Sequence, residues 1–261
     1  MVGESVTLVG RARLALAVDR DMANGFKLFG SDHLWALGVL VVVAGIAVAI
    51  ARRQGASGSR TLRYTIALAL LGSHASEWLV SWLQGWISLD ILPLQLCDWA
   101  AILSMYSLPT LDQRTIEPLY FFALSGTLPA LLTPELDVGF PHFRFLIYFM
   151  EHGLTVLAPL VLVLGLRRLP RPRAWLRAFV QLNVLAVIAA VTNAALGTNF
   201  MYLSQKPVDP SPFDWFGPWP YYLVVMEAVA FAIFWVLDLP LRGARGPGWC
   251  DPRLAPGTAG G

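Results

Sequence analysis

One cysteine and two histidines fall inside long apolar segments, where ionisable groups are costly and usually functional. They are Cys97, His74 and His152. A thiolate is a nucleophile, but apolar surroundings keep a thiol protonated, so a nearby imidazole is needed to accept the proton. The sequence therefore predicts Cys97 as a nucleophile a few residues below the outer surface, with His152 as its general base and His74 in reserve. The alternative is a packed, inert cysteine with no imidazole beside it.

Further polar side chains lie in the outer half of the membrane or just above it. Glu77 follows His74 by three residues, so the two share one helical face and could simply neutralise each other. Glu227 is either a site residue or the partner of a histidine on a neighbouring helix. The residues predicted to support catalysis or bind substrate are His74, Glu77, Asp98, Asn199, Lys206 and Glu227.

The sequence lacks the motifs that are typical of metal sites, serine hydrolases and phosphate-binding loops. No pair of His or Cys residues has i, i+4 spacing, and neither CxxC nor HExxH occurs, so no metal site is predicted. The GxSxG signature of serine hydrolases and phosphate-binding glycine loops are also absent, and no cofactor is expected. A formal charge of +2 is too small to indicate nucleic-acid binding.

Long apolar segments must position these residues. The 261 residues are 56% hydrophobic and 14% charged, whereas soluble domains are about 25% charged. Seven segments approach the roughly 20 residues needed to cross a bilayer. The third is the shortest and carries Gln95, Cys97 and Asp98, and a re-entrant hairpin is the alternative there. The sequence predicts an all-α polytopic bundle of about seven transmembrane helices at 33–51, 62–84, 93–109, 116–134, 143–166, 174–196 and 220–240.

Positive charges are concentrated in alternate connections. The loops after the first, third and fifth segments and the C-terminal region hold most of the arginines, whereas the other loops hold only Arg144 and Lys206. By the positive-inside rule, the arginine-rich connections are cytoplasmic. We therefore expect a multi-pass protein of the cell membrane with its N-terminus outside and its C-terminus inside.

Two short regions flank the predicted membrane domain, which covers residues 26–243. Residues 244–261 have the composition of a disordered cytoplasmic tail. Residues 1–25 form an N-terminal extension whose basic residues break the charge rule; a start at Met22 would remove three of them, and an interfacial helix is the alternative. The loop 197–219 is rich in proline and aromatic residues, so we expect it to fold over the outer end of the bundle.

Five strings of residues resemble the YwaF-type bacterial integral membrane family, which groups with eukaryotic transmembrane acyltransferase-like proteins. They occur in order along the chain, at Phe29–His33 (FGSDH), Leu92–Asp98 (LPLQLCD), Leu132–Pro134 (LTP), Gly197–Pro207 (GTNFMYLSQKP) and Phe216–Pro220 (FGPWP). The resemblance implies acyl transfer on membrane lipids through a Cys and a His, which would be Cys97 and His152. It also favours a start at Met22.

These observations predict a membrane-embedded enzyme that transfers or hydrolyses lipid acyl groups. Cys97 would form a thioester, and His152 would act first as base and then as acid. The expected partners are membrane lipids, and the oligomeric state is left open. One alternative is a small transporter or ligand-sensing protein with a polar site in the outer half. Another is a structural subunit whose buried polar groups only specify packing.

Overall fold

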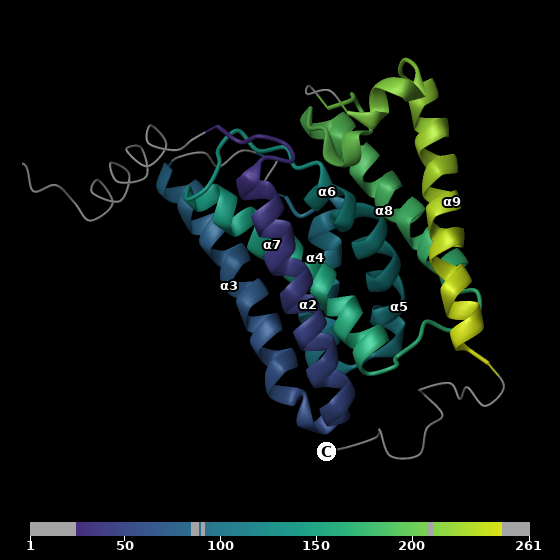
Figure 1. The fold of residues 1–261 in the computed structure, drawn as a ribbon. Helices are drawn as coiled ribbons and strands as arrows, with labels where there is room; N and C mark the ends of the chain where they lie inside the picture. The colour runs from purple at the N-terminus through teal and green to yellow at the C-terminus, as the bar shows by residue number, and fades with distance from the viewer. Residues whose placement is uncertain (1–24, 85–88, 90–91, 208–210, 247–261) are drawn as a thin grey trace, which may run out of the picture.

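Helices make up the regular structure throughout the part of the chain that the computed structural model describes, residues 25–84, 89, 92–207 and 211–246 (Figure 1). Short π-helical segments continue two of the helices, and the described residues contain no strand beyond one isolated bridge. The helices are α2 (Ser31–Gly58), α3 (Arg60–Gln84), α4 (Leu96–Thr110), α5 (Gln113–Phe122) continued by η2 (Ala123–Thr127) and α6 (Leu128–Leu132), α7 (Phe143–Pro159) continued by η3 (Leu160–Gly165), α8 (Ala174–Leu196) and α9 (Tyr221–Ala244). The predicted start at Met22 and most of the predicted tail lie outside the described residues.

Six of these helical segments are long and apolar enough to cross a bilayer. They are α2, α3, α5 with η2 and α6, α7 with η3, α8 and α9. Each corresponds to one of the predicted apolar segments. The prediction of an all-helical, multi-pass membrane protein is therefore confirmed.

The seventh segment, α4, is shorter than a bilayer-spanning helix. Its 15 residues extend over about 22 Å, compared with about 30 Å for the hydrocarbon core. The helix begins at Leu96 because Gln95 is extended and serves as its N-cap. The Asp98 carboxylate accepts a hydrogen bond from the Gln95 N–H at 2.9 Å, which closes a capping box.

Arg63 joins the ends of α3 and α4. Its guanidinium is buried and donates hydrogen bonds to the carbonyl groups of Leu108 and Pro109 in the last turn of α4, and to that of Ala56 in α2. A cation is favoured there because the last carbonyls of a helix have no partner within the helix. Since α3 and α4 pack along their length in opposite directions, the Arg63–Leu108 contact gives both helices a common reference level.

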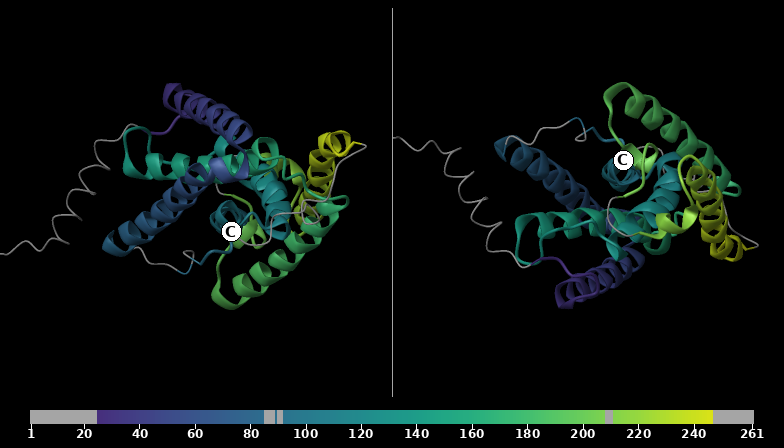
Figure 2. Two further views of the ribbon diagram at one scale, coloured as in Figure 1. Left: turned by 90° about the horizontal axis from the view of Figure 1, so that it is seen from below. Right: turned by 90° about the horizontal axis from the view of Figure 1, so that it is seen from above.

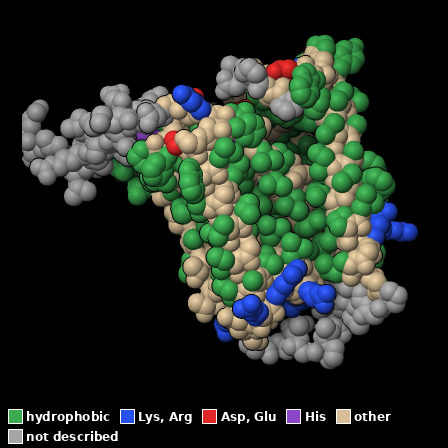
Figure 3. Space-filling model, in the orientation of Figure 1, with side chains coloured by type: hydrophobic (Ala, Val, Ile, Leu, Met, Phe, Trp, Pro, Cys, Tyr) green, Lys and Arg blue, Asp and Glu red, His purple; other side chains and the backbone are tan. Residues whose placement is uncertain are grey.

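The sides of the bundle are apolar. Viewed along the bundle, α2 and α3 lie on one side and α8 and α9 on the other (Figure 2). Their outward faces expose large aliphatic residues, among them Val41, Val191 and Val224. The Lys and Arg side chains on the visible face lie mainly near the end where α2 meets α3 (Figure 3). Such continuous apolar surface suits contact with lipid tails.

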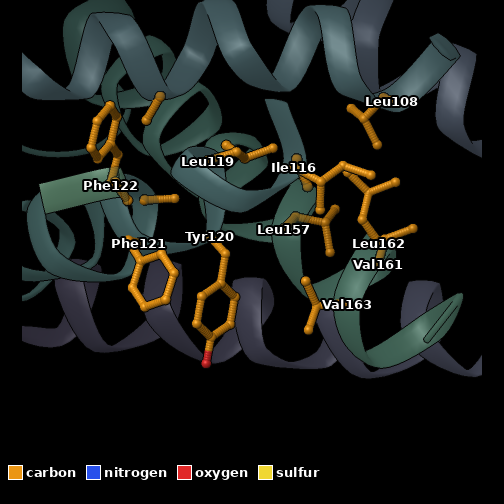
Figure 4. Close-up of a cluster of buried hydrophobic side chains, with 14 of the residues drawn as sticks. Leu108, Ile116, Leu119, Tyr120, Phe121, Phe122, Leu157, Val161, Leu162 and Val163 are labelled. Atoms are coloured by element: carbon orange, nitrogen blue, oxygen red, sulfur yellow. The ribbon is translucent and has the colours of Figure 1, made fainter. Parts of the chain in front are cut away.

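The core lies where α5 packs against α7 and η3. It contains Leu119 and Phe121 from α5 together with Leu157 and Leu162 from the α7–η3 segment, all almost completely buried (Figure 4). Phe121 also stacks on Phe234 of α9, with ring centroids 5.4 Å apart. These contacts attach α9 to the core and make α5 the centre of the bundle.

The orientation of the bundle in the membrane remains a prediction from the arginine pattern. Alkaline phosphatase fused after residue 88 or 138 is expected to be active, because the enzyme folds only outside the cytoplasm. Fusions after residues 56, 113 or 171 are expected to be inactive. A green fluorescent reporter at the same positions should give the opposite pattern, and phosphatase activity at 171 would show the reverse orientation.

Candidate functional site

A cluster of ionisable side chains lies between α3 and α7. The Nδ1 atom of His74 is 2.5 Å from Oε1 of Glu151, and the two side chains are 18% and 10% exposed. Glu77 lies one turn along α3 from His74, on the same face. The nearest ligand atoms of His74, Glu77 and Glu151 all lie within 4.8 Å of one another. His74 thus pairs with Glu151 of another helix, and Glu77 is its neighbour on the same helix.

Cys97 lies at the same level of the bundle as His74. His74 is 11 residues after Arg63, and Cys97 is 11 residues before Leu108, so each is about 16 Å above the Arg63–Leu108 contact. Helix α3 continues for ten residues beyond His74, or about 15 Å. Helix α4 therefore begins below the end of its neighbour α3, and the depth of Cys97 below the outer surface stays a prediction.

The thiol of Cys97 is half-buried and free in the first turn of α4. It faces the hydroxyl group of Thr127 in η2 and lies within electrostatic reach of Asp98 and Glu151. The first N–H groups of a helix have no carbonyl partner within it, and they favour negative charge nearby. The helix start therefore favours an oxyanion formed beside the sulfur, whereas the carboxylates of Asp98 and Glu151 oppose a thiolate, so the thiol needs a base to accept its proton.

His152 is held in one orientation by Tyr148. Its Nδ1 atom is 3.1 Å from the carbonyl oxygen of Tyr148, and its ring stacks on that of Tyr148 with centroids 4.1 Å apart. A carbonyl oxygen only accepts, so Nδ1 must carry the proton, and Nε2 is left as the basic nitrogen. Tyr148 is itself anchored by a 2.8 Å hydrogen bond from its hydroxyl to the carbonyl oxygen of Ala130.

The Cys97–His152 pair remains a hypothesis. No hydrogen bond joins the Cys97 sulfur to His152 or to His74 among the residues that the structure describes. Both residues nevertheless interact with Tyr148, whose ring stacks on that of His152 and which lies within electrostatic reach of Cys97.

The other predicted site residues have structural partners. Asp98 caps α4. Glu227 accepts a 2.8 Å hydrogen bond from Asn183 of α8, and not from a histidine. Asn199 holds the following turn through hydrogen bonds to Ser204 and Gln205. The Lys206 ammonium lies 5.6 Å from the centre of the Tyr222 ring, a cation–π contact. Of the sequence-predicted set, only His74 and Glu77 join Glu151 in the cluster.

Glu151 is the site residue that the sequence did not select. It is adjacent to His152 in an apolar helix, which was the one available signal. Neighbouring residues on a helix point about 100° apart, so Glu151 faces α3 while the ring of His152 lies against Tyr148 on α7 itself.

The segment after α8 covers the start of α4. It contains η4 (Phe200–Tyr202) and η5 (Pro212–Phe216). The Met201 N–H donates a 2.8 Å hydrogen bond to Oε1 of Gln95. The side-chain amide of Asn193 donates to the carbonyl oxygen of the buried Phe200 and accepts from its N–H. Of the predicted cover 197–219, η4 therefore lies against the start of α4 and η5 packs against α9, while 208–210 lie outside the described residues; that this end of the bundle is the outer one stays a prediction. We call Thr198–Leu203 the cover of Cys97.

The cover is attached by Tyr202, whose hydroxyl donates a 2.7 Å hydrogen bond to Oε2 of Glu135. Burial and this hydrogen bond raise the pKa of Tyr202, so the phenol keeps its proton.

Tyr202→Phe should lower the free energy that keeps the cover closed by about 1 kcal/mol, because the hydrogen bond to Glu135 is lost. The open fraction of the cover should then rise about fivefold. The measurement is the rate of Cys97 alkylation by a water-soluble maleimide in a Cys250→Ala background. The exposed Tyr221 provides the control Tyr221→Phe, and equal rates in both variants would contradict the prediction.

Comparison with known proteins identifies a family. The TMEM164 family matches residues 28–238, which include every helix described from α2 to α8, Cys97 and the α3–α7 cluster. Comparisons with curated proteins and with solved structures give no match. The YwaF-type similarity remains a resemblance. Because the match covers most of the sequence, the chain belongs to the TMEM164 family, a family of transmembrane proteins.

Proposed function

We propose that the protein is a membrane-embedded acyltransferase that carries a lipid acyl group on Cys97. The observation that carries the proposal is the position of this thiol. It lies in the first turn of a helix that begins inside the bundle, close to Glu151 and to the Tyr148 that orients His152. A nucleophile, an oriented base and N–H groups at the start of a helix are groups that acyl transfer uses.

His152 is the proposed base because its Nε2 is the unprotonated nitrogen. This atom takes the thiol proton while the sulfur attacks the ester carbonyl carbon of a lipid. The C–S bond forms, the ester C–O bond breaks, and the imidazolium returns the proton to the departing lipid oxygen. In the second half, the hydroxyl group of an acceptor lipid loses its proton to His152 and attacks the carbonyl carbon of the thioester. The new C–O bond forms, the C–S bond breaks, and the imidazolium returns the proton to the departing sulfur.

The start of α4 would stabilise the intermediate. The carbonyl oxygen becomes negatively charged when sulfur attacks, and preorganised N–H donors directed at such an oxygen are worth about 2.7–4 kcal/mol each. The amides of the first turn of α4 are the nearest such donors to the sulfur, because Cys97 itself belongs to that turn.

Several features support a lipid as the substrate. The outward faces of the flanking helices are apolar, which suits a protein whose substrate lies in the bilayer. The η4 segment is bonded to Gln95 at the start of α4; a cover there would exclude water from the thiol, which favours transfer over hydrolysis. The resemblance to transmembrane acyltransferase-like proteins supports the same chemistry.

The test is acyl exchange in vesicles. Purified protein is reconstituted with phosphatidylcholine carrying an isotopically labelled acyl chain and with an unlabelled lysophospholipid. We expect label in the diacyl phospholipid formed from the lysophospholipid acceptor and a hydroxylamine-sensitive acyl adduct on Cys97, both detected by mass spectrometry. Labelled free fatty acid in place of the new ester would indicate hydrolysis through the same thioester. Absence of both the product and the adduct across phospholipid headgroups would overturn the proposal.

A transporter or ligand-sensing protein is the second candidate. It is favoured by the cluster of His74, Glu77 and Glu151, because ionisable residues in contact inside a membrane are typical of ion and proton pathways. Vesicles containing a pH-sensitive dye would distinguish it. Proton flux that depends on Glu77 and Glu151 but not on Cys97 would favour transport over acyl transfer.

A further inference from the structure

The cluster between α3 and α7 has an arrangement that the proposed acyl transfer does not require. His74 contributes an imidazole, and Glu77 and Glu151 contribute carboxylates, with ligand atoms all within 4.8 Å of one another. Two of these residues come from α3 and one from α7, two helices in extensive contact. The cluster therefore lies at a fixed junction between two membrane helices.

The closest pair in the cluster is a contact between an imidazole and a carboxylate. The Nδ1 atom of His74 is inaccessible to solvent and lies 2.5 Å from Oε1 of Glu151. A carboxylate oxygen of Glu77 lies within 4.8 Å of both atoms. Three lone-pair donors this close together are the arrangement that a bound cation would use.

A divalent cation would also match the charges of the cluster. His74, Glu77 and Glu151 lie within electrostatic reach of one another, and each lies within reach of Asp98 at the start of α4. Negative charge is expensive inside a membrane-spanning segment. The two glutamates of the cluster, with a neutral imidazole, would offset the charge of a divalent ion.

We propose that His74, Glu77 and Glu151 bind a divalent transition-metal ion, with Zn²⁺ as the best fit. An imidazole ligand disfavours Mg²⁺ and Ca²⁺, which prefer all-oxygen sites, and Zn²⁺ accepts mixed nitrogen and oxygen ligands. Tetrahedral zinc with bonds of about 2.0–2.2 Å places its ligands within the observed spacing after small side-chain movements. Three protein ligands leave a fourth coordination position open, as in catalytic zinc sites.

This proposal goes beyond the acyl transfer and does not depend on it, because Cys97 is not one of the three ligands. The sequence predicted no metal site because the ligands are spaced i, i+3 on one helix and the third comes from a helix about 75 residues further along. A bound ion would join α3 to α7 and would offer a Lewis acid to an oxygen atom of a lipid headgroup or ester.

The experiment measures metal content and affinity, without an activity assay. Purified protein in detergent is freed of metal, incubated with Zn²⁺ and analysed by mass spectrometry for metal per chain. We expect about one Zn²⁺ per chain in the wild type and at least a tenfold weaker affinity in Glu77→Gln and Glu151→Gln. Co²⁺ in place of Zn²⁺ should give visible absorption that these variants lose.

Two variants serve as controls. Glu227→Gln changes a carboxylate on another membrane helix that pairs with Asn183, and Cys97→Ala removes the thiol; both should bind Zn²⁺ as the wild type does. Glu77 is the more exposed ligand, so Glu77→Gln is the variant expected to keep its fold, verified by gel filtration and circular dichroism. No stoichiometric Zn²⁺ in the wild type, or equal affinity in Glu77→Gln and Glu227→Gln, would overturn the proposal. Loss of binding in Cys97→Ala would also overturn it, since the thiol would then be a ligand.

Discussion

Cys97→Ala is expected to abolish acyl transfer in reconstituted vesicles, and His152→Gln is expected to slow it by about 10²–10⁴-fold. The alanine side chain cannot form the thioester on which both half-reactions depend. Glutamine is close to histidine in size but cannot accept the thiol proton, so its effect isolates the loss of the base. The measurement is the initial rate of labelled product formation, normalised to the amount of folded protein.

The same variants should also differ in the reactivity of the thiol. Iodoacetamide should alkylate Cys97 more slowly in His152→Gln than in the wild type, because less thiolate forms without the base. Cys250→Ala serves as the matched control and should retain full transfer activity. Product formation by Cys97→Ala at the wild-type rate would exclude the thioester mechanism. A larger loss in His74→Gln than in His152→Gln would assign the role of base to His74.

The fold was largely predictable because membrane insertion depends on local composition. Helices such as α2 and α8 each contain a strongly apolar stretch of 18 residues with at most two charged residues, and a helix satisfies the backbone of such a segment in a bilayer. The late start of α4 was harder to predict. It depends on the Gln95–Asp98 capping box together with the contact between Gln95 and Met201, which lies more than 100 residues further along the chain.

The site was predictable only in part, for a reason of geometry. Residue type and depth identified Cys97, His74 and His152 as the chemically capable groups. Pairing between helices depends on how each helix is rotated about its axis, which the sequence does not show when the segment is apolar all round. The 2.5 Å contact of His74 with Glu151 could therefore be found only from the packing of α3 against α7.

Two arginines of the predicted cytoplasmic loops have a second role that the charge pattern alone did not indicate. Arg171 and Arg177 belong to the predicted cytoplasmic loop after the fifth segment, and both bind Glu117 of α5. Arg171 donates from its Nη2 atom to Oε2 at 2.8 Å and from its backbone N–H to Oε1 at 3.0 Å, with a further bond from Nε. Glu117 is only 3% exposed, so the pair holds this loop against the centre of the bundle.

Arg171→Ala is accordingly expected to lower the free energy of unfolding by about 3–5 kcal/mol, because it leaves the buried Glu117 carboxylate without its main partner. Arg177→Ala is the matched control. It removes a guanidinium that binds the same carboxylate at 2.9 Å, but the Arg177 side chain is 46% exposed, so its loss should cost no more than about 1 kcal/mol. The measurement is equilibrium unfolding in mixed micelles of increasing SDS content, followed by tryptophan fluorescence.

The double variant Glu117→Leu, Arg171→Leu distinguishes the stability that the ion pair contributes from the stability that is lost when one charge is left unpaired. Apolar residues of similar volume remove both charges at once, so most of the stability lost in Arg171→Ala should return. If the pair instead contributes through favourable attraction, the double variant will be as unstable as Arg171→Ala. An equal decrease in the free energy of unfolding in Arg171→Ala and Arg177→Ala would contradict the prediction. It would show that the buried arginine stabilises the Glu117 carboxylate no more than the exposed one does.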